Sequence, residues 1–256
     1  MDYRVLIGCP VRNRAWILPR YLQCLQKLDY PPDLLEYCFI VNGCEDNTPA
    51  VLEDFAAVCN GTARIIYADV PASHVHRRGQ YNLQYLAYLR NLLLSAFLQT
   101  KCQYLFSLDS DILAPRQALK QLIADDCDII SALVCNGHLL KEQNLFNVLR
   151  KENGNYVHMR NVPRDRVFTV DCTGAAYLIK RRVIEKYGVR YSAQNGAEDI
   201  GFCEMAQSMG ITICCDGRIE CEHIMHEPET DRHRFYEMHT DYKSHMQDKI
   251  VWHPQK

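Results

Sequence analysis

The sequence has no apolar run long enough to cross a bilayer, since a membrane-spanning helix needs about 20 consecutive apolar residues. The apolar run near its start covers only residues 5–8, which is too short for the apolar core of a secretory signal peptide. The formal net charge is -2, so no overall field attracts nucleic acid or an anionic membrane. We therefore expect a soluble, cytoplasmic protein without a transmembrane segment, which leaves room for peripheral membrane contact.

The sequence also lacks C-x-x-C pairs, although it contains 13 cysteines. A secreted disulfide framework is usually shorter and has an even number of cysteines, and C-x-x-C is typical of structural zinc ribbons. We therefore expect most of these cysteines to be buried thiols in a reducing compartment. One cluster has the alternative interpretation of a zinc site, although its spacing fits no common zinc pattern. It consists of Cys214, Cys215, Cys221, His223 and His226.

Internal repeats and low-complexity linkers are absent as well, so 256 residues that are 48% hydrophobic suit one α/β domain. In the first half, short apolar segments alternate with longer segments whose apolar residues recur at a helical period. This alternation predicts a parallel, doubly wound sheet with helices on both faces. The expected strands are residues 4–8, 37–41, 63–67 and 104–108, and the expected helices are residues 15–28, 49–59 with Thr48 as the cap, and 83–98.

The second half is less regular. Asn153-Gly154-Asn155 is typical of a hairpin tip. A helix is predicted over residues 200–209 and is ended by Gly210. Further strands are expected at residues 167–170, 175–179 and 211–215, and the charged tail from residue 227 is expected to be helical.

Three polar clusters follow expected strands. They are Pro10-Val11-Arg12-Asn13, residues 42–47, and Asp109-Ser110-Asp111. In doubly wound sheets, ligands bind beyond the carboxyl ends of the strands. The three clusters therefore predict a ligand site at one edge of the sheet.

Asp109 and Asp111 are separated by one small residue, directly after an apolar segment. Alternate side chains of an extended segment point the same way, so both carboxylates can face one space. Hard oxygen ligands suit Mg²⁺ or Mn²⁺ that bridges two phosphates. The tripeptide alone is common in solvated loops, but its place at the end of a buried strand favours a metal site.

Six short motifs occur in a consistent order along the chain, and together they carry a resemblance. The chain resembles the GT-A fold glycosyltransferases, in particular glycosyltransferase family 2 and its relatives, from about residue 4 to residue 226. Each motif alone is weak, but six in order at plausible spacing are a strong signal. They are Pro10-Val11-Arg12-Asn13, Arg90-Asn91, Asp109-Ser110-Asp111, Thr173-Gly174-Ala175, Glu198-Asp199 and His223.

The resemblance implies a Rossmann-like, mostly parallel sheet with a smaller mixed sheet on the acceptor side. It implies one GT-A domain over residues 1–226, with a nucleotide-sugar-binding half of about residues 1–111 and an acceptor-side half of about residues 112–226. A C-terminal helical tail would follow at residues 227–256. The implied activity is metal-dependent transfer of a sugar, with a hexose expected, from a nucleotide-diphosphate sugar to an unknown glycan, peptide or small-molecule acceptor.

The resemblance also implies roles for individual residues. Asp111 would ligate Mn²⁺ or Mg²⁺ directly, and Asp109 would contact the ribose, or the metal through water. His223 would be the third metal contact, with His226 as the alternative. The nucleotide-sugar site would comprise Pro10, Val11, Arg12, Asn13, Asn42, Arg90, Asp109, Ser110 and Asp111, and the acceptor side Thr173, Gly174 and Ala175.

The resemblance also implies that Asp199, with Glu198 beside it, is the catalytic base. Base catalysis needs a carboxylate within hydrogen-bond reach of the acceptor hydroxyl. We expect the start of a helix at this position to keep Asp199 ionised. Attack from the face opposite the leaving group implies inversion of the anomeric configuration.

One departure from the family pattern concerns the nucleotide. Asn42 and Gly43 stand where many relatives have an acidic pair that reads uracil, so the choice of nucleotide stays open. Two alternative functions also remain. One is a nucleotide-sugar-binding protein without transfer activity. The other is a Mg²⁺-dependent nucleotidyltransferase, for which Gly8-Cys9-Pro10 does not provide the usual Gly-rich phosphate loop.

Overall fold

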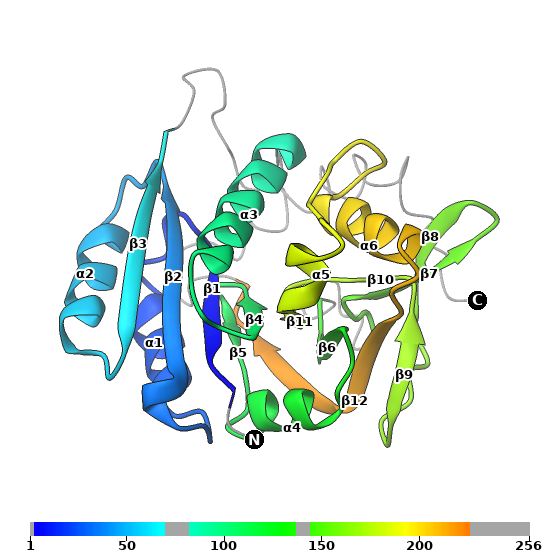
Figure 1. Cartoon of the computed structure of the whole chain (residues 1–256), viewed down its shortest axis with the longest axis horizontal. Coiled ribbons are helices and arrows are strands. Elements are labelled where there is room, and N and C mark those ends of the chain that lie inside the picture. The colour runs from blue at the N-terminus through cyan, green and yellow to red at the C-terminus, as the bar shows by residue number, and fades with distance from the viewer. Residues whose placement is uncertain (1–2, 70–81, 137–143, 226–256) are drawn as a thin grey trace, which may run out of the picture.

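The computed structural model describes residues 3–69, 82–136 and 144–225. It shows an α/β fold in which helices cover both faces of one large sheet (Figure 1). The tail expected at residues 227–256 and the alternative ligand His226 lie outside these residues. The first half consists of β1 (Val5–Val11), α1 (Leu18–Gln26), the 3-10 turn η1 (Pro32–Leu34), β2 (Leu35–Asn42), α2 (Thr48–Val58), β3 (Thr62–Ala68), α3 (Leu83–Leu98) and β4 (Tyr104–Leu108).

The first four strands form the parallel unit that the sequence predicts. Their order is β3-β2-β1-β4, and every neighbouring pair is parallel. The strands β1, β2 and β4 are almost entirely buried, because helices cover both of their faces. The chain order reverses between β1 and β4, so the loops that follow these two strands flank the crevice where such sheets bind ligands.

The second half extends the same sheet. The order continues β4-β11-β6-β12-β5, with β11 antiparallel to both β4 and β6, and β9 pairs with β12. A separate sheet of order β10-β7-β8 is antiparallel. The elements are β5 (Ile112–Leu113), α4 (Ala118–Ala124), β6 (Ile129–Val134), β7 (Val148–Glu152), β8 (Asn155–His158), β9 (Val167–Val170), β10 (Cys172–Thr173), β11 (Ala176–Lys180), α5 (Arg181–Glu185), α6 (Glu198–Ser208) and β12 (Ile213–His223).

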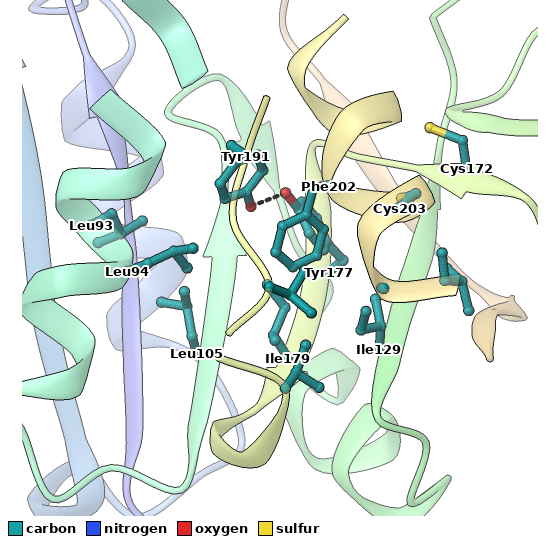
Figure 2. Packing of buried hydrophobic residues seen from close by; sticks show 14 of the residues in the cluster. Leu93, Leu94, Leu105, Ile129, Cys172, Tyr177, Ile179, Tyr191, Phe202 and Cys203 are labelled. Atoms are coloured by element: carbon teal, nitrogen blue, oxygen red, sulfur yellow. Dashed lines mark hydrogen bonds between the residues drawn. The ribbon is translucent and has the colours of Figure 1, made fainter. Parts of the chain in front are cut away.

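Two hydrophobic cores lie on the two faces of the sheet. Helices α3, α5 and α6 pack on one face and α1, α2 and α4 on the other. Side chains of each strand alternate between the cores, so Leu105 joins the first core, part of which Figure 2 shows, and Phe106 joins the second. Helices α3 and α6 both cover the face of the first core (Figure 1), and they contact each other there. This contact brings polar residues of the two helices together, although the helices are far apart in the chain.

The cysteines follow the same alternation. All 13 are free thiols, and Cys215 faces the first core whereas Cys214 and Cys221 face the second. These three cysteines therefore do not converge on a zinc ion. In the described ranges, no helix is long and apolar enough to span a membrane.

Several expected element boundaries shift by a few residues, and two of the differences affect the site. Helix α2 starts at Thr48, so Asn47 and not Thr48 occupies the cap position. The Thr48 N–H donates to Asp46 Oδ1 at 3.0 Å, and Thr48 Oγ1 accepts from the Arg14 N–H at 2.7 Å. Thr48 thus ties the loop after β1 to the loop after β2. Strand β12 also continues well past residue 215, through a register shift between Asp216 and Glu220.

Candidate active site

The loops after β1 and β2 are joined by side-chain to backbone hydrogen bonds. Asn13 has a left-handed backbone with φ 49°, and its Oδ1 accepts from the Glu45 N–H at 2.8 Å. Asn42 is buried at the end of β2. Val11 packs into the core, next to Pro10 at the end of β1. These four of the residues predicted to bind the nucleotide sugar therefore form the carboxyl ends of β1 and β2 and the turn after β1. The charged side chains of the site come from the segments that follow.

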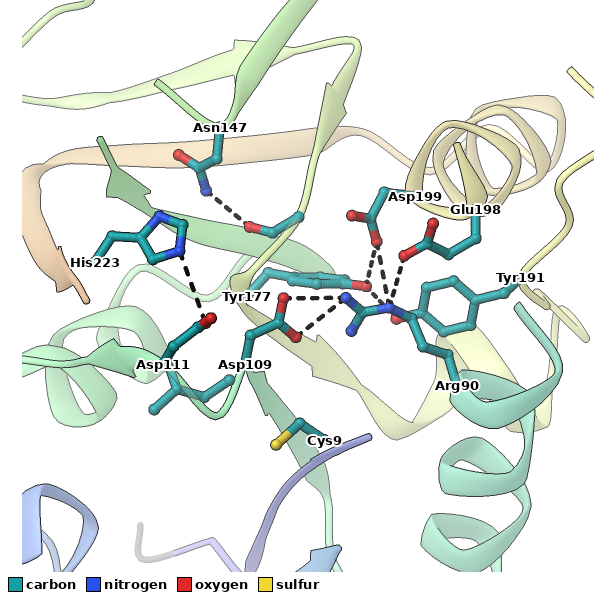
Figure 3. A network of polar contacts seen from close by, with 12 residues as sticks. Cys9, Arg90, Asp109, Asp111, Asn147, Tyr177, Tyr191, Glu198, Asp199 and His223 are labelled. Atoms are coloured by element: carbon teal, nitrogen blue, oxygen red, sulfur yellow. Dashed lines mark hydrogen bonds and ion pairs between the residues drawn. The ribbon is translucent and has the colours of Figure 1, made fainter. Parts of the chain in front are cut away.

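Asp111 lies between two cationic or coordinating side chains. Arg14 Nη2 is 3.2 Å from Asp111 Oδ2. Figure 3 shows His223 on the other side, with Nε2 3.7 Å from Asp111 Oδ1. His223 reaches this place because β12 pairs with β5 immediately after Asp111, with His223 opposite Ile112. The extension of β12 is therefore what brings the predicted histidine to the predicted aspartate.

The orientation of His223 is fixed by a neighbour. Its Nδ1 lies 3.0 Å from Asn136 Oδ1, and an amide oxygen can only accept a hydrogen bond. Nδ1 therefore donates to Asn136, and Nε2 faces Asp111. A hydrogen bond of this kind from the second ring nitrogen is typical of metal-binding histidines.

Asp109, the other acidic residue of the motif, turns to Arg90. The Arg90 Nη2 atom lies 3.1 Å from both carboxylate oxygens of Asp109. The three predicted metal ligands are thus separated: Asp109 pairs with Arg90, whereas Asp111 and His223 face each other. In the part of the chain that the structure describes, no three His, Cys, Asp or Glu side chains converge as a metal site, so the protein brings two potential ligands together.

Arg90 is the centre of a buried charge cluster. Its side chain is only 5% exposed. Besides Asp109 it contacts Glu198 Oε1 at 3.0 Å and Asp199 Oδ1 at 3.9 Å, both through Nε (Figure 3). One guanidinium from α3 therefore faces three carboxylates, one directly after β4 and two from α6, and it joins the aspartate motif to the predicted base.

Asp199 lies in the first turn of helix α6 as expected, but its ionisation differs from the expectation. The pKa of Asp199 is raised to about 8, chiefly because the carboxyl is buried, with Glu198 and Asp109 adding to the rise and Arg90 opposing it. Burial also raises the pKa of Glu198. A helix N-terminus is worth about 0.3–1 kcal/mol to an exposed carboxylate, which is less than the cost of burial and of two like charges.

The predicted Thr-Gly-Ala segment positions both acidic groups. A Cβ atom on Gly174 would lie 2.1 Å from Asp199 Oδ2, so only glycine permits this approach. The Asp109 N–H donates to the Ala175 carbonyl at 2.8 Å, and Ala175 has φ 66°. Thr173 is buried, and its hydroxyl donates to Ser131 Oγ at 2.8 Å. The segment therefore packs against both acidic residues. The Thr173 hydroxyl is used inside the protein and is not presented to a sugar acceptor.

Five residues of this region carry no sequence signal that would mark them in advance. Arg14 follows the predicted turn by one position, and Asn136 lies in a loop after β6. Asn147 holds the Gly174 carbonyl at 2.8 Å. Tyr177 and Tyr191 lie beside Asp199 in Figure 3. Their roles depend on contacts between distant segments.

Three site arginines keep buried nitrogen atoms without a hydrogen-bond partner among the described residues. These atoms are Arg12 Nη1, Arg14 Nε and Arg90 Nη1. Buried polar atoms in native proteins nearly always have a partner, so such atoms at one sheet edge call for a ligand. Guanidinium groups bind phosphate through paired N–H donors, and a diphosphate has the required chemistry.

Comparison with solved structures confirms the GT-A fold. Mannosyltransferase PcManGT from Pyrobaculum calidifontis, in complex with GDP-Man and Mn²⁺, has a TM-score of 0.60 and 16% identity, and the match covers 97% of this chain and 65% of that one. S. aureus TarS 1-349 in complex with UDP-GlcNAc has a TM-score of 0.58 and 15% identity over 97% and 67% of the two chains. GalNAc-T7 with UDP, GalNAc and Mn²⁺ has a TM-score of 0.62 and 14% identity over 87% and 44%.

Comparison of sequences identifies the family. The chain is 28% identical over 145 residues to the mannan polymerase II complex anp1 subunit of Schizosaccharomyces pombe, a match that covers 50% of this chain and 34% of that protein. The chain thus aligns with about a third of the length of this relative. Residues 1–156 match the Anp1 family. Because this match covers more than half of the 256 residues, the chain belongs to the Anp1 family.

Proposed function

We propose that this protein is a metal-dependent glycosyltransferase that binds a nucleotide-diphosphate sugar at the carboxyl edge of β1, β2 and β4. The observation that carries the proposal is the pairing of Asp111 with His223 beside Arg14. Cation ligands and phosphate-binding guanidinium groups meet there at the crevice of the sheet. In this proposal residues 1–111 bind the donor and residues 112–226 the acceptor.

The side chains at Asp111 fit a divalent cation that protein and substrate hold jointly. Mg²⁺ is commonly bound through one or two carboxylates together with substrate phosphates, and Mn²⁺ accepts the same oxygen ligands. Asp111 and His223 would be the protein ligands, and Asp109 would stay with Arg90. When bound, the ion supplies Lewis-acid stabilisation of the charge on the leaving diphosphate.

Asp199 acts as the base in this proposal. Its carboxylate takes the proton from the acceptor hydroxyl, whose oxygen forms a bond to the anomeric carbon while the bond from that carbon to the diphosphate breaks. The products are a glycoside of inverted configuration and a nucleoside diphosphate. Arg12 and Arg14 bind the phosphates, and Arg90 maintains Asp109 and Glu198 in place around the base.

In this proposal the acceptor binds in a pocket beside the Asp111–His223 pair. Asn136, which holds His223, pairs through its backbone N–H with the Leu145 carbonyl at 2.7 Å. A cavity of about 630 Å³ opens beside this segment. Polar side chains that can bind sugar hydroxyls line most of it: Asn144, Arg160, Asn161, Arg164, Asp165 and Arg166, with Phe146 at its wall.

GDP-mannose is the first donor to test. The curated relative is a mannan polymerase subunit, and one solved neighbour is a mannosyltransferase with GDP-Man and Mn²⁺. Asn42, which stands in place of a uracil-reading aspartate, leaves a guanine donor open, since an amide both donates and accepts. Other neighbours bind UDP or UDP-GlcNAc, so UDP sugars are the comparison.

A thermal-shift panel tests the proposed function. GDP-mannose, UDP-GlcNAc and UDP-GalNAc are each added with Mn²⁺ or with EDTA, and the melting temperature is measured. A ligand at 100 times its Kd stabilises a protein by about 2.7 kcal/mol, which corresponds to a rise of roughly 5–10 °C at this chain length. We expect that rise for GDP-mannose with Mn²⁺ and little with EDTA. Equal melting temperatures with every nucleotide sugar and Mn²⁺ would contradict the proposal.

A further inference from the structure

Two tyrosine hydroxyls form a short chain that ends on Asp199. The Tyr191 and Tyr177 hydroxyls are hydrogen-bonded to each other (Figure 2), and the Tyr177 hydroxyl donates to Asp199 Oδ1 at 3.2 Å (Figure 3). When Asp199 is ionised it can only accept, so Tyr177 donates to it and the Tyr191 hydroxyl is the donor in the first bond. Both residues are buried: Tyr177 is 0% exposed and Tyr191 is 5% exposed. The chain of donors therefore runs from Tyr191 through Tyr177 to the carboxylate.

Rigid elements hold both tyrosines. Tyr177 lies in β11, between β4 and β6 in the sheet. Asn91 of α3 clamps the backbone of Tyr191 with two hydrogen bonds of 2.9 Å, one to its N–H and one to its carbonyl. The Tyr191 ring stacks on Phe202 of α6 with centroids 4.5 Å apart. The predicted Arg90-Asn91 pair is thus divided: Arg90 faces the acids, and Asn91 fixes Tyr191.

The two oxygens of Asp199 consequently have different surroundings. Oδ1 accepts from Tyr177 and faces Arg90 Nε. Oδ2 lies over Gly174, where no Cβ fills the space. The side chain as a whole is 24% exposed, so Asp199 is the least buried of the groups around Arg90 apart from Asp109, whose side chain is 29% exposed.

We propose that Tyr177, supported by Tyr191 and Asn91, is a positioning residue that binds Oδ1 of Asp199 and leaves Oδ2 to receive the acceptor proton. The inference rests on the proposed function, in which Asp199 is the base. A hydroxyl that donates to a carboxylate favours the ionised form, which is the form that can accept a proton. Tyr177 therefore opposes the burial and like charges that favour the protonated form.

Loss of the Tyr177 hydroxyl is accordingly expected to raise the pKa of Asp199. The charged and titratable groups that face Asp199 come from every element around it: Arg90 from α3, Glu198 from α6, Asp109 after β4, Cys172 from β10, Tyr177 from β11 and Tyr191 before α6. The substitution Tyr177→Phe changes one of these and retains the ring that packs against Phe202.

The test is the pH profile of kcat/KM for Tyr177→Phe. We expect the acid limb to move upward by about 1 pH unit, as follows from the loss of one hydrogen bond to a charged group. Activity at pH 7 falls about ten-fold and recovers above the new pKa. Tyr191→Phe should shift the limb in the same direction but by less. Tyr156→Phe is the matched control. The Tyr156 hydroxyl donates at 3.0 Å to Glu204, a carboxylate that lies on α6 as Asp199 does. The pH profile of this variant should match that of the wild type.

A profile of Tyr177→Phe that superimposes on the wild type, or one lowered equally at all pH values, would overturn the inference. The ¹³C carboxyl resonance of Asp199, assigned with Asp199→Asn, gives the same titration without turnover. If Tyr177→Phe does not fold, the shift in Tyr191→Phe decides. Full activity of Asp199→Asn would contradict the proposed function itself, whereas an inactive Asp199→Asn with an unmoved Tyr177→Phe profile contradicts only the positioning role.

Discussion

Replacement of Arg90 by methionine is expected to lower the free energy of unfolding by about 3–5 kcal/mol, the usual cost of removing one partner of a buried ion pair. Methionine retains an unbranched apolar chain of similar length, so loss of packing is small. Glu198 and Asp109 then lose the cation that lies 3.0 and 3.1 Å from them. Urea unfolding followed by circular dichroism at pH 7 measures the effect.

The pH dependence and a control separate charge from packing. Without Arg90 the folded-state pKa values of Glu198 and Asp199 rise, so the penalty is smallest at low pH, where both carboxyls are protonated, and grows as pH rises. Arg20→Met removes an exposed ion pair with Glu222, whose side chains are 55% and 61% exposed. That control should cost less than about 1 kcal/mol. Equal small losses in both variants would show that Arg90 does not hold the cluster together.

Replacement of Asp199 by asparagine is expected to reduce transfer by about 10²–10⁴-fold, the usual contribution of a general base. Asparagine has nearly the same shape but cannot accept the proton of the acceptor hydroxyl. Donor affinity should stay within about two-fold of the wild type, since Asp199 lies 3.9 Å from the predicted donor-binding Arg90, whereas Glu198 and Asp109 hold that guanidinium at 3.0 and 3.1 Å. Single-turnover transfer and donor titration measure the two quantities.

The same variant tests the ionisation of Asp199. Its folded-state pKa of about 8 lies above the ordinary value of 3.8. The contribution of Asp199 to wild-type stability is therefore greatest below pH 3.8 and declines as pH rises between these values, and Asp199→Asn should lack this contribution. Asp126→Asn is a suitable control because that side chain is 82% exposed and pairs with Lys180. Full transfer activity in Asp199→Asn would exclude its role as base.

The sequence allowed correct prediction of features that depend on local rules. Apolar segments followed by acids placed Asp109 and Asp111 at a strand end, and the helix predicted over residues 200–209, together with the family motif Glu198-Asp199, placed Asp199 at a helix start. The order of strands was beyond such rules. The antiparallel β11 lies between β4 and β6, and this insertion is what brings Gly174 against Asp199.

The contacts that organise the site join segments far apart in the chain. Arg90 is 108 residues from Glu198, and Arg14 is 97 residues from Asp111. Neither pair has a sequence spacing that indicates contact, and the buried Tyr177 is indistinguishable by pattern from any core residue of a strand. Asp199 illustrates the same limit, because its raised pKa depends on burial among neighbours from other elements.

The most direct test of the proposed function is calorimetric titration of GDP into the protein with and without Mn²⁺. We predict that Mn²⁺ raises the affinity of the wild type at least about ten-fold, a difference of about 1.4 kcal/mol, and that Asp111→Asn loses this gain. Asp29→Asn, which alters an exposed residue paired with Lys120, should retain it. GDP affinity that is independent of Mn²⁺ in the wild type, or an equal Mn²⁺ effect in Asp111→Asn, would contradict a metal held by Asp111 against the nucleotide diphosphate.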